Sequence, residues 1–502
     1  MELDDDICYR ALRARDPRFD GRFFVAVSTT KIYCRPICPA RTPFRDHVTF
    51  YPTAAAAQEA GYRPCLRCRP ETAPNIGAWR GTSNTVSRAL TLIEAGGLDD
   101  DDVEGLAARL GIGGRQLRRL FDEHIGASPL AVAQTRRVLL AKQLIHETGL
   151  PMAEVAHASG FGSVRRFNDT FHRLFKRPPS ALRRRGAARD GSALELTLGY
   201  RPPYDWDAII GFLAARAIPG IEVVTPERYR RTFDAGTVAV SHEPARRRLR
   251  VSVRLADVAQ LPSILMRVRR VFDLAADPES IASHLSLDPA LAPLVARRPG
   301  LRVPGGWDGF EMAVRAVIGQ QITVAGARQL LGKLVAAYGA PIEGGAGGLT
   351  HVFPAPARLT GADIAALGMP KARGMAISNV ACAALADPML FERAAALDDG
   401  IARLCAVSGI GDWTAHYIAI RALREPDAFP ASDIGLLRAL ARNGVRPTPK
   451  EALARAEAWR PWRAYAAQHL WTHDVAHPGK EKKIEAHART VAVADRNHSA
   501  GL

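Results

Sequence analysis

A cluster of cysteines near the N-terminus is the sequence feature that most constrains the fold. Four of the seven cysteines in the chain form two close pairs, spaced C-x3-C and C-x2-C. The N-terminal segment 1–6 is acidic and lacks the basic and apolar regions of a signal peptide, which indicates a cytosolic protein. Disulfides are rare in that reducing compartment, so the pairs are expected to bind metal. The clustered residues are Cys34, Cys38, Cys65 and Cys68.

Two close pairs of thiolates on separate loops can supply all four ligands of a tetrahedral zinc ion. We therefore expect one Zn²⁺ in a small zinc-bound domain over residues 1–80. Residue types alone favour a structural role, because such sites commonly stabilise domains too small for a large core. The alternative is a thiolate that zinc keeps reactive.

The charge of the chain points to a polyanionic partner. Lys and Arg number 68 against 51 Asp and Glu, which gives a net charge of +17. Nucleic acid is the commonest partner of such a chain, although a general bias toward Arg is the alternative explanation. No run of about 18 apolar residues predicts a membrane span.

At 502 residues the chain is long enough for several domains. Composition and periodicity predict a multidomain α+β protein. The alternating segments 194–198, 237–240 and 249–253 are typical of strands in an antiparallel sheet, whereas most other segments have helical periodicity. After the zinc domain we expect an all-helical domain over 85–186, an α+β domain over 193–302, an all-helical domain over 303–480 and a tail over 481–502.

The first helical zone contains two helix-turn-helix patterns, over 103–121 and 152–175. Each has a glycine at the turn, Gly111 or Gly160, and a basic amphipathic second helix that suits the major groove of DNA. The phenylalanines at 161, 167, 171 and 175 are expected in the core rather than on DNA. The candidate DNA contacts are Arg115, Arg118, Arg165 and Arg166.

A helix-hairpin-helix pattern occupies residues 401–421. Gly409 and Gly411 allow the backbone to approach a phosphate closely, so that amides at a helix N-terminus can bind it. This motif alone implies DNA binding only. Asp433 follows it, and two interpretations of that residue remain open: a helix N-cap after Ser432, or a catalytic carboxylate.

The segments 23–36 and 61–68, which flank the cysteines, resemble the N-terminal domain of the Ada adaptive-response regulators. The resemblance implies that Cys34 accepts a methyl group irreversibly from a DNA methylphosphotriester. Neighbouring arginines would hold the phosphate backbone. Methylation removes one negative charge from the zinc site, so the methylated protein is expected to bind DNA more tightly. The candidate phosphate ligands are Arg35, Arg41, Arg45, Arg63 and Arg67.

Residues 152–180 resemble AraC-type regulators, although Pro178 stands where that family often has Gly. The resemblance implies a transcriptional activator with RNA polymerase as a partner. Ada proteins usually carry a second methyl acceptor in a Pro-Cys-His-Arg motif, which this sequence lacks. Cys382 and Cys405 lie in apolar helical segments and are expected to be buried structural thiols.

Residues 193–477 resemble 3-methyladenine DNA glycosylase II of the helix-hairpin-helix superfamily, notably at 201–206 and 459–465. This resemblance favours catalysis by Asp433, which would stabilise an oxocarbenium ion or orient a water during excision of an alkylated base. Gln321 would insert into the duplex as the base flips out. Aromatic faces would stack on the cationic base. The candidate base-pocket residues are Trp413, Tyr417 and Trp471, and the alternative is that these rings only pack in the core.

Two features narrow this expected activity. Trp413 occupies the position of the lysine nucleophile in bifunctional relatives, so no lyase activity is expected. No four-cysteine iron–sulfur pattern follows Asp433. Two departures from the family, Ile434 after the aspartate and a polar Gln321, leave the range of excised bases open.

The sequence therefore predicts a monomeric, cytoplasmic, nucleoid-associated protein that acts on double-stranded DNA. It would combine a stoichiometric methyltransferase and regulator with a monofunctional DNA-3-methyladenine glycosylase. The alternative is a DNA-binding regulator whose C-terminal half holds damaged DNA without excising bases.

Overall fold

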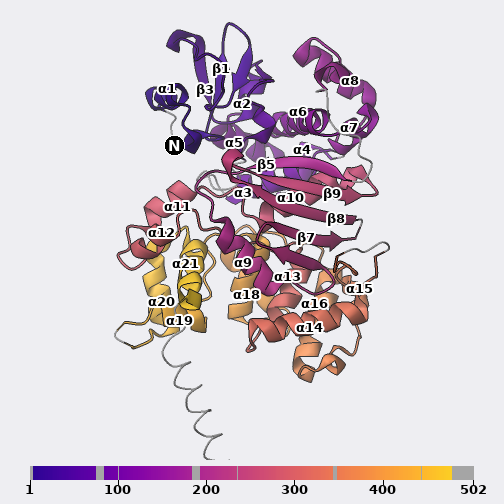
Figure 1. Cartoon of the computed structure of the whole chain (residues 1–502), viewed down its shortest axis with the longest axis vertical. Helices are drawn as coiled ribbons and strands as arrows, with labels where there is room; N and C mark the ends of the chain where they lie inside the picture. Colours follow the sequence, from indigo (N-terminus) through magenta and orange to yellow (C-terminus); the bar gives the residue numbers. More distant parts are fainter. Residues whose placement is uncertain are drawn as a thin grey trace, which may run out of the picture.

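The computed structural model describes residues 4–74, 84–99, 101–183, 193–234, 236–342, 347–442 and 444–476 (Figure 1). The predicted linker 186–192 and tail 481–502 lie outside these ranges. Among the described residues, no helix combines the length and the apolar character needed to cross a membrane.

The N-terminal domain is built on a four-stranded sheet of order β3-β1-β2-β4. Strands β1 and β3 pair antiparallel, as do β1 and β2, whereas β2 and β4 run parallel with Tyr33 opposite Pro64. The next residues, Cys34 and Cys65, are consequently neighbours at the carboxyl ends of these strands. The elements are α1 (Asp5–Ala14), β1 (Phe24–Val27), β2 (Ile32–Cys34), β3 (Val48–Tyr51), α2 (Ala54–Glu59) and β4 (Arg63–Pro64).

Both predicted helix-turn-helix units are present in the second domain. Gly111 and Gly160 have φ of 75° and 82°, the left-handed backbone that a glycine turn supplies. The four phenylalanines between Phe161 and Phe175 are buried, as expected. The elements are α3 (Asn84–Glu94), α4 (Val103–Leu110), α5 (Gly114–Ile125), α6 (Pro129–Glu147), α7 (Met152–Ala158) and α8 (Val164–Phe175).

The third domain is an antiparallel five-stranded sheet of order β5-β9-β8-β7-β6 with helices against it. Alternate residues such as Leu196 and Leu198 face the core and are completely buried. The elements are β5 (Leu194–Gly199), α9 (Trp206–Arg216), β6 (Glu222–Thr225), β7 (Arg228–Phe233), β8 (Gly236–Glu243), β9 (Arg248–Leu255) and α10 (Leu261–Val271).

From residue 278 onward the described chain is mostly helical, and its large core also takes in Ile218 and Ile221 from the segment before β6. Its helices are α11 (Pro278–Leu285), α12 (Ala292–Arg297), α13 (Gly309–Ile318), α14 (Val324–Tyr338), α15 (Pro356–Leu359), α16 (Lys371–Ala386), α17 (Leu397–Cys405), α18 (Asp412–Ile418), α19 (Ile434–Ala439), α20 (Pro449–Ala456) and α21 (Arg463–Ala476). The prediction that Cys382 and Cys405 are buried was wrong, because both thiols are exposed. Val380 and Ala381 occupy the inward face of α16, and Leu404 occupies that of α17.

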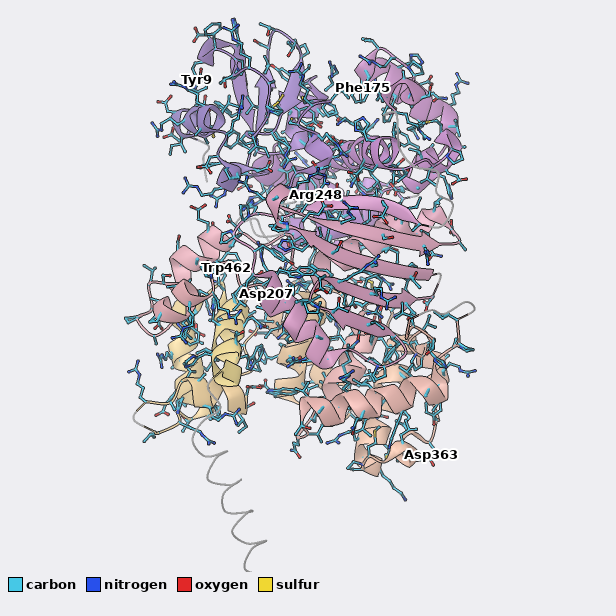
Figure 2. The ribbon with its side chains drawn as sticks, viewed as in Figure 1. Tyr9, Phe175, Asp207, Arg248, Asp363 and Trp462 are labelled. Carbon is cyan, nitrogen blue, oxygen red and sulfur yellow. The ribbon has the colours of Figure 1, made fainter. Side chains whose placement is uncertain are left out.

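The second helix-turn-helix and the sheet share one continuous apolar cluster. It joins side chains of α6 to α8, such as Leu144 and Phe171, to Leu198 of β5 and Val251 of β9. Figure 2 labels one residue on each side of this contact, Phe175 on α8 and Arg248 on β9. The regulator-like and sheet domains are therefore packed together rather than merely linked.

Candidate functional site

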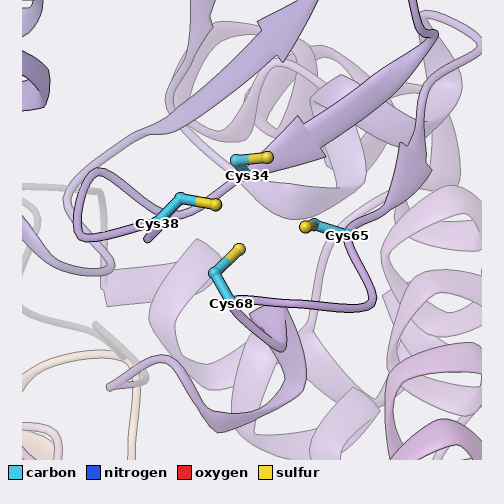
Figure 3. A group of neighbouring side chains, drawn as sticks. All are labelled: Cys34, Cys38, Cys65 and Cys68. Carbon is cyan, nitrogen blue, oxygen red and sulfur yellow. The ribbon is translucent and has the colours of Figure 1, made fainter. Parts of the chain in front are cut away.

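The four clustered cysteines converge at the end of β2 and β4. Their Sγ atoms all lie within 4.8 Å of one another, and their side chains point toward a common centre (Figure 3). Four sulfur donors at this spacing fit one tetrahedral Zn²⁺. Cys34 is the partly exposed member of the set, whereas Cys38, Cys65 and Cys68 are buried.

Backbone donors distinguish the sulfurs further. The amide of Arg35 donates to Sγ of Cys68 at 3.3 Å, and the amide of Arg67 donates to Sγ of Cys65 at 3.3 Å. Hydrogen bonds to a thiolate stabilise its charge and reduce its nucleophilicity. The exposed Cys34 is consequently the sulfur best placed to meet a substrate.

A cavity of about 400 Å³ opens beside Cys34. Arg41, Arg63 and Arg67 line it together with Thr29 and Thr30. Guanidinium and hydroxyl donors around an apolar floor suit a phosphate ester. Three of the five candidate arginines, Arg41, Arg63 and Arg67, therefore line the cavity.

Arg35 has partners within the protein. Its guanidinium is largely buried, forms an ion pair with Asp20, and donates to the Cys68 carbonyl at 3.2 Å and to Thr72 Oγ1 at 2.7 Å. These partners occupy the side chain, so Arg35 stabilises the loop that carries Cys65 and Cys68 (residues 65–72, the zinc loop). Arg45 is partly exposed and pairs with Asp5 at 2.9 Å.

The predicted arginines of the two helix-turn-helix units are all exposed. Arg118 pairs with Glu104 at 2.8 Å, and the side chain of Arg165 is 93% exposed with Asp169 at 3.9 Å. Solvent-exposed pairs of this kind are weak and exchange readily for a phosphate. Arg115 and Arg166 also face solvent on the second helix of each unit.

Helices α17 and α18 and the hairpin between them form the helix-hairpin-helix. The two glycines of the hairpin differ in backbone conformation and in the space around them. Gly409 has φ of +99°, and a Cβ there would come within 2.3 Å of the Cβ of Ala376 in α16. Gly411 precedes α18 with ordinary extended backbone, and a Cβ there would meet no atom within 4 Å. Packing therefore requires glycine at 409 but not at 411.

The carboxylate of Asp433, at the start of α19, accepts hydrogen bonds from three N–H donors. Its Oδ1 accepts the amide of Leu436 at 3.0 Å, which is the N-cap contact. The indole Nε1–H of Trp413 donates to Oδ2 at 2.8 Å, and that of Trp471 donates to Oδ1 at 2.9 Å. The N-cap geometry is therefore present, and two distant indoles fix the same carboxylate.

The three predicted aromatic residues form one group beside this carboxylate. Trp413 and Tyr417 stack with ring centroids 5.3 Å apart, and Trp471 meets Tyr417 edge-on at 6.1 Å. Sequence reasoning missed Arg421, whose Cζ lies 5.4 Å from the Tyr417 ring and 5.3 Å from the Trp471 ring. Burial lowers the pKa of Arg421 to about 10. The sequence offered one indication of this residue, since Arg421 is the single charged residue in the apolar segment 418–423.

Gln321 is exposed next to the hairpin with φ of 53°, a conformation uncommon outside glycine. Its neighbour Gln320, which sequence reasoning missed, donates to the Gly409 carbonyl at 3.1 Å and to Thr414 Oγ1 at 2.9 Å. Arg373 donates to the Gln320 carbonyl at 2.7 Å. These hydrogen bonds attach the loop after α13 to the hairpin. The exposed Gln321 therefore follows a residue whose position is fixed.

Comparison with known families agrees with this arrangement. The metal binding domain of Ada matches residues 7–71, a helix-turn-helix domain matches 106–185, and the AlkA N-terminal domain matches 195–308. The zinc expectation is confirmed by the Ada match together with the converging cysteines. The fold and site define a DNA repair protein with a fused regulator.

Curated relatives cover the whole chain and each half. A probable bifunctional transcriptional activator/DNA repair enzyme AlkA of Mycobacterium tuberculosis is 45% identical over 95% of this chain and 98% of its own length. DNA-3-methyladenine glycosylase 2 of Escherichia coli is 34% identical over 55% of this chain and 96% of its own length. The Ada enzyme of Escherichia coli is 39% identical over 27% of this chain and 37% of its own length. The chain belongs to the family of bifunctional AlkA-type transcriptional activators and DNA repair enzymes.

Proposed function

We propose that the C-terminal half is a monofunctional DNA glycosylase that excises alkylated bases such as 3-methyladenine. The observation that supports this most strongly is the convergence of two indole N–H donors on Asp433 beside an aromatic group. An alkylated purine is cationic, so it is a good leaving group and is attracted to aromatic faces. Trp413, Tyr417 and Trp471 are the proposed stacking residues.

In this mechanism the target nucleotide leaves the duplex before its bond breaks. Gln321 fills the space that it vacates, and backbone amides at Gly409 and Gly411 hold the phosphate. The carboxylate of Asp433 stabilises the oxocarbenium ion as the glycosidic bond breaks, and water then attacks C1′. Trp413 stands where a lysine would form a Schiff base, so the product is an abasic site.

We propose that the N-terminal domain repairs methylphosphotriesters at Cys34. The Cys34 sulfur attacks the methyl carbon, the S–C bond forms as the C–O bond breaks, and the phosphodiester anion leaves. Cys34, Cys38, Cys65 and Cys68 would hold Zn²⁺, which would keep the Cys34 sulfur deprotonated at neutral pH. Arg41, Arg63 and Arg67 orient the phosphate. The thioether is stable, so each molecule reacts once.

The proposed regulatory role belongs to residues 85–186. Arg115 and Arg118 on α5, and Arg165 and Arg166 on α8, would contact promoter DNA, and RNA polymerase would be the protein partner. The protein would act as a cytoplasmic, nucleoid-associated monomer. The glycosylase would comprise residues 193–302 and 303–480, and the zinc domain residues 1–80.

Excision is tested by incubating alkylated duplex DNA with the unmutated protein and with Asp433→Asn. Asn is as good an N-cap as Asp, so this variant keeps the cap while it removes the negative charge. We expect release of 3-methyladenine by the unmutated protein and at least a hundredfold loss in the variant, on the order of a lost electrostatic stabiliser. No release by the unmutated protein would favour the alternative, a regulator that holds damaged DNA.

A further inference from the structure

Helix α18 contacts both ends of the segment 429–433, which leads to Asp433. At one end, Trp413 donates to the Asp433 carboxylate at 2.8 Å. At the other, the amide of Phe429 donates to Nδ1 of His416 at 3.2 Å. Within the segment the amide of Asp433 donates to the Pro430 carbonyl at 2.9 Å. One helix thus fixes a short turn through two side chains.

The contact with Phe429 defines the protonation state of His416. Because Nδ1 accepts a hydrogen bond, the imidazole is neutral and carries its proton on Nε2. Nε2 faces Asp412 Oδ1 at 3.7 Å. The other charged groups that face the ring are Asp398 of α17 and Arg463 of α21. Burial, which outweighs the attraction to Asp412, lowers the pKa of His416 below its usual 6.5.

We propose that His416 is a positioning residue for base excision, acting through Phe429 on the placement of Asp433. This inference rests on the proposed catalytic role of Asp433. Protonation of Nδ1 would turn the acceptor into a donor facing the Phe429 N–H. The segment would then lose its anchor, so excision should decline as the imidazole titrates.

The test compares single-turnover excision across pH in the intact protein, His416→Asn and His416→Leu. Asn places an acceptor oxygen where Nδ1 lies and does not titrate. We expect His416→Asn to keep the neutral-pH rate and to move the acid decline to lower pH. His416→Leu should lower the rate about tenfold or more with little change in duplex affinity, because small misplacements of reacting groups are costly.

Thermal unfolding of both variants controls for general destabilisation. If the unmutated protein excises bases but His416→Leu matches its rate and pH profile, the positioning role is overturned. If the unmutated protein excises nothing, the proposed glycosylase function fails and this inference fails with it. A rate loss in His416→Leu that His416→Asn does not rescue would also contradict the role of the acceptor.

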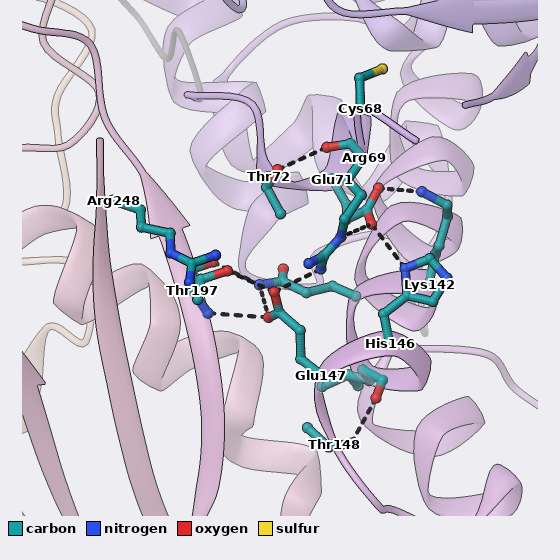
Figure 4. A network of polar contacts seen from close by, with 12 residues as sticks. Cys68, Arg69, Glu71, Thr72, Lys142, His146, Glu147, Thr148, Thr197 and Arg248 are labelled. Atoms are coloured by element: carbon teal, nitrogen blue, oxygen red, sulfur yellow. Dashed lines mark hydrogen bonds and ion pairs between the residues drawn. The ribbon is translucent and has the colours of Figure 1, made fainter. Parts of the chain in front are cut away.

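A second, independent observation concerns the contacts between the zinc loop (residues 65–72), helix α6 and strand β5 of the five-stranded sheet (Figure 4). Arg69, next to the ligand Cys68, donates to Glu147 Oε1 at 2.7 Å. Glu147, at the end of α6, also accepts the amide of Thr197 at 3.1 Å and its hydroxyl at 2.6 Å. Gln143 donates to the Thr197 carbonyl at 2.8 Å. Strand β5 lies at the edge of the sheet, so one side of it has no neighbouring strand. Side chains of α6 form hydrogen bonds with backbone groups on that side.

The same helix is attached to the zinc loop by a buried cation. Lys142 is completely buried, donates to the carbonyl of the zinc ligand Cys65 at 3.0 Å, and forms an ion pair with the buried Glu71. The strand also contacts the loop directly, because a Cβ on Gly199 would lie 2.4 Å from the Thr72 carbonyl oxygen. The zinc loop, α6 and β5 are therefore one packed unit.

We infer that the state of the zinc site is transmitted to the edge of the glycosylase sheet through Glu147. Two of the four zinc ligands lie in the loop that carries Arg69 and Glu71, so metal binding orders this loop. The ordered loop places Arg69 on Glu147, and Glu147 then holds the backbone of Thr197.

Amide hydrogen exchange of the full chain tests this inference without any activity measurement. Removal of zinc with a chelator should raise exchange in residues 194–199 at least tenfold, and peptides from α20 should not change. In Glu147→Gln, exchange in β5 should already be raised with zinc present and should respond less to the chelator. Equal β5 exchange with and without zinc in the unmutated protein would overturn the coupling. A full zinc response in Glu147→Gln would overturn the role of Glu147.

Discussion

The indole nitrogen of Trp471 lies 2.9 Å from Oδ1 of Asp433, although 37 residues separate them in the chain. Trp413 meets the second oxygen of the same carboxylate from another helix. The helical domain thus brings α18, α19 and α21 together around one acidic group. An N-cap needs only the local amide of Leu436, so the two indoles indicate a role beyond capping.

Trp471→Phe should reduce excision about tenfold, because it removes one hydrogen bond to a charged group worth about 1.5–3 kcal/mol while it keeps an aromatic ring. Trp206→Phe is the control. Its indole donates to the Pro226 carbonyl at 2.8 Å in the sheet domain, outside the group around Asp433. Single-turnover release of 3-methyladenine measures both variants. Equal losses in the two would contradict a specific role for Trp471.

Gly409→Ala should destabilise the protein by at least about 2 kcal/mol, because alanine there is strained by the positive φ and collides with Ala376. Gly411→Ala should cost less than about 1 kcal/mol, since its site is open and only the N-cap preference for glycine over alanine is lost. Urea unfolding of the two variants decides the comparison. Similar stabilities would contradict the packing at the hairpin.

The buried pair of Lys142 and Glu71 should contribute to acid sensitivity. Burial alone would raise the pKa of Glu71, but Lys142, His146 and Arg69 outweigh burial and lower that pKa to about 2. A depressed folded-state pKa stabilises the protein above the ordinary value of 4.5, and this stabilisation is lost as pH falls from 4.5 toward 2. Glu71→Gln should flatten this part of the stability profile, measured by thermal unfolding. An unchanged slope would contradict the ion pair.

Methylation of Cys34 should tighten DNA binding, most strongly at low salt, because the zinc site loses one negative charge. Duplex affinity before and after reaction, measured across salt concentrations, checks this expectation. Cys34→Ser is the control, since it should accept no methyl group. Identical salt-dependent affinities before and after methylation would remove the charge mechanism.

Residue type and spacing were sufficient to predict features whose chemistry is local. The zinc ligands are an example, because two short cysteine pairs already imply their metal. The helix-turn-helix and hairpin turns were likewise marked by glycines such as Gly111 and Gly409. The aromatic group around Asp433 was predictable through the family resemblance, not from spacing.

Features that depend on distant partners could not be predicted in this way. Arg35 is occupied by Asp20, which no spacing rule connects to it. Cys382 lies in the alanine-rich helix α16, whose apolar residues do not mark one inward face, so the sequence did not indicate its exposure. Cys405 is the last residue of the amphipathic helix α17, one position after the buried Leu404. The contact between Glu147 and Thr197 exists only once α6 meets the edge of the sheet.

Release of 3-methyladenine from alkylated duplex by the unmutated protein and by Asp433→Asn tests the central claim most directly. Thermal unfolding of the same samples checks that the variant is folded at the assay temperature. We predict excision by the unmutated protein, and at least a hundredfold slower excision by the folded variant. Equal excision by the two proteins would contradict the assignment of Asp433 as the catalytic carboxylate.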